Sequence, residues 1–60
     1  MISILEFENF SINHYRNSKL RLGQDFCNSF NITDNNDLFY QPDDRVSIQM
    51  IYDEYIKIER

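Results

Sequence analysis

The sequence predicts an all-α fold, a small bundle of three helices with a short acidic loop before the last helix. Apolar side chains recur every three or four residues in three segments, which is the spacing of one helix face. Only one glycine and one proline occur among 60 residues, and no repeat or low-complexity tract divides the chain. We therefore expect a single helical domain over residues 1–60.

The first predicted helix runs from Ser3 to Arg16. Its apolar residues with near-helical spacing are Ile4, Phe7, Phe10 and Tyr15. The alternation of Ile2 and Ile4 ahead of Glu6 also suits a short strand, so that alternative stays open, with helix preferred.

The second predicted helix runs from Lys19 to Asn31, with Asn17-Ser18 as the stop of the first helix and a new N-cap. Its broad apolar face consists of Leu20, Leu22, Gly23, Phe26, Cys27 and Phe30. Gly23 costs a helix about 1 kcal/mol relative to alanine. The preferred explanation is close helix packing at Gly23, where a neighbouring helix or aromatic ring approaches the backbone. A kink or a backbone contact with a partner is the alternative.

The third segment begins with the loop from Ile32 to Asp37, whose side chains favour caps and turns. Thr33 or Asp34 is expected to cap a single turn that carries Leu38, Phe39 and Tyr40. Pro42 ends that turn, because the residue before a proline avoids the helical region.

The last predicted helix runs from Asp44 to Ile58, and Asp43 or Asp44 is its expected cap. Its apolar face consists of Ile48, Ile51, Tyr52, Tyr55 and either Ile58 or Glu59. The core is expected between the second helix, through Phe26 and Phe30, and the last helix, through Ile48, Ile51 and Tyr55.

No catalytic, cofactor or metal site is expected. Cys27 and His14 are the only cysteine and histidine, which excludes an internal disulfide and a cysteine–histidine zinc site within one chain. The acidic loop has Leu38 and Phe39 where a calcium-binding loop needs an oxygen ligand and a glycine. Cys27 is expected to be a small buried hydrophobe, and His14 a surface residue. We therefore expect a protein that is not an enzyme.

Ten acidic and six basic residues give a net charge of −4, which disfavours nucleic acid and anionic membranes as partners. A nucleic-acid-binding alternative rests on Arg16, Lys19 and Arg21, three charges more typical of a solvated face. The opening MISILEF has neither the basic start of a signal peptide nor the length of a membrane span, so a cytoplasmic location is expected. Because so short a chain builds a small core, a homodimer is also expected.

An acidic aromatic cluster precedes the last helix. Four aspartates surround Leu38 and two aromatic residues, and the predicted partner-binding residues are Asp34, Asp37, Phe39, Tyr40, Asp43 and Asp44. Aromatic residues supply binding energy at interfaces, and carboxylates steer a chain toward a basic partner. The alternative is that Phe39 fills the bottom of the core while the aspartates cap helices and keep the chain soluble.

Three stretches of the chain, RLGQDFCNSF, DLFYQPDD and IYDEYI, resemble a recurring type of very short open reading frame in phage and prophage genomes. The residues that fit are Gly23, Gln24, Asn28, Phe39 and Tyr40. The resemblance implies a phage-type accessory protein in the host cytoplasm that binds and blocks a host protein with a basic surface. The specific function that this resemblance implies is an anti-CRISPR or other anti-defence inhibitor. A structural or regulatory homo-oligomer is the alternative.

Overall fold

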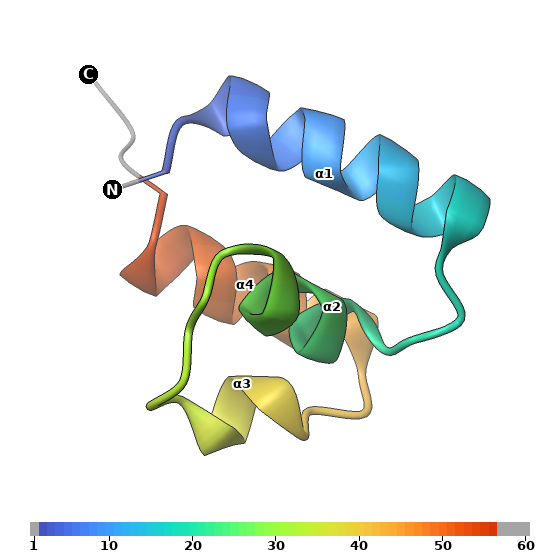
Figure 1. Cartoon of the computed structure of the whole chain (residues 1–60). Coiled ribbons are helices and arrows are strands. Elements are labelled where there is room, and N and C mark those ends of the chain that lie inside the picture. The colour runs from blue at the N-terminus through green and yellow to red at the C-terminus, as the bar shows by residue number, and fades with distance from the viewer. Residues whose placement is uncertain (1, 57–60) are drawn as a thin grey trace.

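A computed structural model of the chain describes residues 2–56 and contains, in this part, the four helices α1 (Ile4–Asn17), α2 (Leu22–Ser29), α3 (Asn36–Phe39) and α4 (Asp44–Glu54) (Figure 1). The predicted all-α class is confirmed, and the single turn predicted to carry Leu38, Phe39 and Tyr40 is the short helix α3, with Tyr40 at its C-cap. The helix α2 is central, since it contacts each of the other three. In Figure 1, α1 lies on one side of α2 and α3 on the other.

The segment from Ile4 to Asn17 is a helix and not a strand. Ser3 is its N-cap, because the Ser3 hydroxyl accepts a hydrogen bond from the Glu6 amide at 3.1 Å. The same hydroxyl donates to Glu6 Oε1 at 3.2 Å, so serine and glutamate hold the first turn together. Ahead of this helix, Ile2 forms an isolated parallel bridge to Ile56, near the two ends of the described chain.

The helix α2 is shorter at both ends than the sequence predicts. Ser18 does not cap it; the Ser18 hydroxyl accepts from the Leu20 amide at 3.1 Å, and Leu20 lies outside α2 and is exposed rather than on its apolar face. At the other end Asn31 is in the left-handed region, with φ 56°. The Ile32 amide then donates to the Cys27 carbonyl at 2.9 Å, which closes a Schellman motif and ends the helix before Asn31.

Gly23 is the point of closest helix packing, as the sequence predicts. It is buried in α2 and faces Leu38 of α3. A Cβ atom at Gly23 would overlap the Leu38 carbonyl oxygen and lie 3.1 Å from its carbonyl carbon and 3.2 Å from Leu38 Cδ1. The chain therefore carries its single glycine where the backbones of α2 and α3 meet.

The helix α4 begins where the sequence predicts and ends earlier. Asp43 is the N-cap, and its carboxylate accepts from the Arg45 amide at 2.9 Å. The helix ends at Glu54, because the next residues turn toward the start of the chain: the Tyr55 carbonyl accepts from the Ile2 amide at 2.8 Å, and Ile56 is buried. The predicted extension through Tyr55 and Ile56 is therefore wrong, and its last two residues, 57–58, lie outside the described residues.

The core draws on all four helices, and not only on the second and the last. Its buried apolar residues are Phe7, Phe10, Leu22, Phe26, Cys27, Leu38, Ile51 and Ile56. Phe26 does meet Tyr55, with ring centroids 5.7 Å apart, whereas the half-buried Phe30 contacts the rings of Phe10 and Phe26. On α4 and at its C-cap, the predicted residues Ile48, Ile51, Tyr52 and Tyr55 all lie in or against the core, and the fully buried Ser47, which was not predicted, joins them.

Candidate functional site

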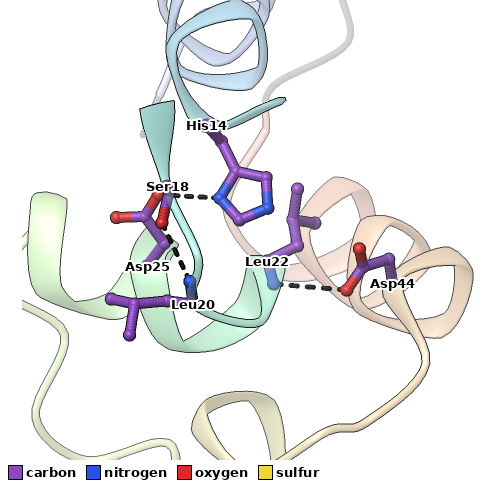
Figure 2. Close-up of polar contacts among 6 residues, drawn as sticks. All are labelled: His14, Ser18, Leu20, Leu22, Asp25 and Asp44. Atoms are coloured by element: carbon purple, nitrogen blue, oxygen red, sulfur yellow. Dashed lines mark hydrogen bonds and ion pairs between the residues drawn. The ribbon is translucent and has the colours of Figure 1, made fainter. Parts of the chain in front are cut away.

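The six residues of the predicted acidic aromatic site fall into two groups. Asp43 and Asp44 hold helix ends: Asp43 caps α4, and Asp44 Oδ1 accepts from the Leu22 amide at 3.2 Å (Figure 2). That amide belongs to the first turn of α2, which has no side-chain cap of its own. Asp43 and Asp44 therefore have the capping role that the alternative interpretation gave to the aspartates.

The other four residues lie just before, within and at the end of α3, and we call them the α3 surface: Asp34, Asp37, Phe39 and Tyr40. Asp34 and Asp37 are exposed, and Tyr40 is 64% exposed at the C-cap of α3. Phe39 is half-buried and packs against the core, with its ring centroid 4.9 Å from that of Tyr40. Asp37 and Tyr40 are three residues apart on a helical turn, so they project from the same side.

The side chain of Asn35 adds hydrogen bonds to the packing of Leu38 and Phe39 that holds α3 on the core. Asn35, and not Thr33 or Asp34, caps α3, since its Oδ1 accepts from the Leu38 amide at 3.2 Å. Its Nδ2 donates to Glu54 Oε2 at 2.8 Å and to the Tyr55 hydroxyl at 3.0 Å. Asn35 also lines a hollow of about 280 Å³ beside Phe39 and Tyr40. The α3 surface is thus an ordered surface tied to the end of α4.

A buried polar pair that the sequence did not predict joins α1 to α2. His14 is only 5% exposed, so its predicted surface position is wrong. Its Nδ1 lies 2.7 Å from Asp25 Oδ2, a short hydrogen bond that also counts as an ion pair when the imidazole is protonated (Figure 2). The ring of His14 stacks on Phe10, with centroids 5.9 Å apart and planes 23° apart. The pairing of His14 with a carboxylate explains how this polar residue is tolerated in the interior.

A groove of about 660 Å³ runs between α1 and α2 beside this pair, and we call it the α1–α2 groove. Its residues on α1 include Glu6, Asn9, Asn13 and Asn17. Phe10 and Phe30 supply two aromatic rings, and His14 and Asp25 complete the lining together with two serines. Among residues 2–56, neither lysine nor arginine lines the groove, and its acidic groups are the carboxylates of Glu6 and Asp25.

Cys27 behaves as the small buried hydrophobe that the sequence predicts. It is 2% exposed, and burial raises the pKa of its thiol, which keeps the thiol protonated and unreactive. Within residues 2–56, no group of three or more histidine, cysteine, aspartate or glutamate side chains could hold a metal ion. No helix in this part of the chain has the length and apolarity needed to cross a membrane.

Comparison with known proteins gives no match to a family model, to a curated protein or to a solved structure. The resemblance to short phage reading frames stays a prediction.

Proposed function

We propose that this chain is a phage-type accessory protein that binds a basic surface of a host protein and inhibits it. The observation that carries the proposal is the exposed Tyr40 on an ordered turn with Asp34 and Asp37 beside it in the chain. The anti-CRISPR or other anti-defence form of this function follows from the phage resemblance alone.

The physical support is that the α3 surface combines an exposed aromatic ring with exposed carboxylates. Tyr40 offers a large, rigid aromatic group of the kind that dominates binding energy at interfaces. Asp34 and Asp37 do not cap α3 or α4, whose N-caps are Asn35 and Asp43. Their charges contribute to the net charge of −4, which accelerates encounter with a cationic partner. Because Asn35 anchors α3, little ordering is needed upon binding.

The test is affinity capture from host lysate with the wild-type chain and with two matched double variants. Asp34→Lys with Asp37→Lys reverses the charge of the α3 surface, and Arg16→Glu with Lys19→Glu makes the opposite change at an exposed site elsewhere. We expect one stoichiometric host protein that the wild type and the second variant retain and the first variant loses. Equal capture by both variants would contradict the proposal.

A second candidate function, a homo-oligomer without a host target, is favoured by the outer face of α1. Leu5, Ile12 and Tyr15 lie on one side of this helix and are 66%, 55% and 63% exposed. Packing these residues against a second copy would remove apolar surface from water. Sedimentation across a wide concentration range tests it: a stable monomer of 7.3 kDa at every concentration would exclude self-association.

A further inference from the structure

We propose that the α1–α2 groove is a binding site for an arginine-bearing peptide segment of a partner protein. The groove is a hollow of about 660 Å³ whose lining, among the described residues 2–56, contains two carboxylates and no lysine or arginine, with the part-buried His14–Asp25 pair in its wall. This site is separate from the α3 surface, and the proposal does not depend on the function proposed above.

The acidic groups of the groove retain free hydrogen-bonding capacity. Glu6 uses Oε1 in its contact with Ser3, and Asp25 uses Oδ2 in its contact with His14. Among residues 2–56, neither Glu6 Oε2 nor Asp25 Oδ1 has a hydrogen-bond partner. A guanidinium carries five N–H donors and no acceptor, so it matches carboxylate oxygens that have only acceptors to offer.

The aromatic part of the lining favours arginine over a smaller cation. Phe30 is half-buried at the groove, and a guanidinium can stack on the exposed part of its ring, whereas Phe10 is buried beneath His14 and Phe26. The side-chain carbonyls of Asn9 and Asn13 supply further acceptors along α1. The hollow is broad and largely open to solvent, so an extended peptide segment can lie along it.

The groove is preformed, because its wall is built into the core. His14 is more than nine-tenths buried, bonded to Asp25 across the two helices and stacked on Phe10. Phe10 in turn packs edge-on against Phe26 at the centre of the molecule. A ligand would therefore meet a site whose walls are already ordered.

The first experiment titrates the isotope-labelled chain with the peptide acetyl-Arg-Gly-Arg-amide and follows the backbone amides by two-dimensional NMR. The control peptide has citrulline in place of arginine, which keeps the shape and removes the charge. We expect saturable shifts at Glu6, Asn13, Asp25 and Ser29 with the arginine peptide only. These shifts should weaken as salt is added, since charge pairs are screened.

The second experiment uses charge-removing variants in the groove. Glu6→Gln removes the charge but retains a side chain that suits the third position of a helix. Asp25→Asn removes the charge but retains an oxygen that can accept a hydrogen bond from His14. Each should weaken binding of the arginine peptide about two- to fivefold, the range of an exposed charge pair. Glu8→Gln is the matched control, because it makes the same change on the exposed outer side of α1 and should leave binding unchanged. Circular dichroism establishes that each variant is folded, and Glu6→Gln still tests the site if Asp25→Asn unfolds.

The proposal would be overturned by the absence of shifts at millimolar peptide, by equal shifts with the citrulline peptide, by shifts confined to the α3 surface, or by equal weakening in Glu8→Gln. Shifts confined to the α3 surface would support the function proposed above and reject this site. Shifts of groove amides that depend on the concentration of the chain itself would assign the groove to a second copy and also reject the proposal.

Discussion

The two sides of α2 are packed in different ways. Toward α1 the contact is made by aromatic rings and by the His14–Asp25 pair, and it leaves a groove between the helices. Toward α3 the contact is made at Gly23, where no room remains for even one carbon atom. Large side chains hold helices apart and leave space that a ligand can use, whereas a glycine brings the backbones together and turns the outer residues of α3 toward solvent. The two candidate surfaces follow from this difference.

The largest effect is expected from removing a ring on the α1 side. Phe10→Ala deletes a ring that contacts Phe7, Phe26, Phe30 and His14, and should cost about 3–5 kcal/mol in the free energy of unfolding. A core of this size supplies a similar total, so the variant should be largely unfolded by circular dichroism. Ile12→Ala, on the exposed side of the same helix, should change stability by less than about 0.5 kcal/mol. Similar melting temperatures for the two variants would contradict the assigned faces.

The next effect is expected on the α3 side, from Gly23→Ala. Helix propensity alone favours alanine by about 1 kcal/mol. Overlap with the Leu38 carbonyl should reverse that sign and destabilise the chain by about 1–3 kcal/mol. Asn28→Ala, at an exposed position of α2, is the control and should be neutral or slightly stabilising. If urea titration shows that Gly23→Ala stabilises the chain, the close approach of α2 and α3 is wrong.

A smaller effect should separate the capping aspartates from the α3 surface. Asp44→Ala removes the acceptor for the Leu22 amide and should cost about 1 kcal/mol. Asp44→Asn keeps an acceptor and should cost less. Asp37→Ala should have almost no effect on stability, because Asp37 is exposed and makes no side-chain hydrogen bond within residues 2–56. Thermal melts of the three variants should follow this order, and an equal loss for Asp37→Ala would make that residue structural as well.

The smallest effect concerns pH. Burial raises the pKa of the Cys27 thiol in the folded chain, so the folded state holds this proton more tightly than the unfolded state. The resulting stability is present below the ordinary thiol pKa of about 8.5 and is lost as the pH rises through the folded value. Urea titrations between neutral and alkaline pH should show that the free energy of unfolding of the wild type falls as the pH rises. In Cys27→Ala, the thiol's contribution to this pH dependence should be absent. If the free energy of unfolding depends on pH in the same way in the wild type and in Cys27→Ala, the thiol is exposed to solvent.

Local signals account for most of the fold. The apolar spacing of Phe7 and Phe10, and of Phe26 with its neighbours, indicated helices that the structure contains. The capping box Ser3-Ile4-Leu5-Glu6 is also a local signal and marks the true start of α1, although the spacing of apolar residues alone left a strand open. For the candidate sites, the sequence located Asp34, Asp37 and Tyr40 on a turn. It gave no sign that Asp44 serves a helix that begins 22 residues earlier.

The sequence by itself determined the helical class, the start of the last helix at Asp43 and Asp44, and the need for a close contact at Gly23, because these depend on backbone propensity and side-chain spacing within a few residues. Only the tertiary structure decided that His14 is buried against Asp25, that Ser47 is fully buried beside the core, and that Ile56 leaves the helix to meet Ile2. Each of these features depends on a partner 11 or more residues away or on the angle at which helices pack. The buried Ser47 hydroxyl has no hydrogen-bond partner within residues 2–56, so the packing of α4 alone places it in the interior. His14 is tolerated there because Asp25 of another helix pairs with it, and that partner is found only when the chain is folded.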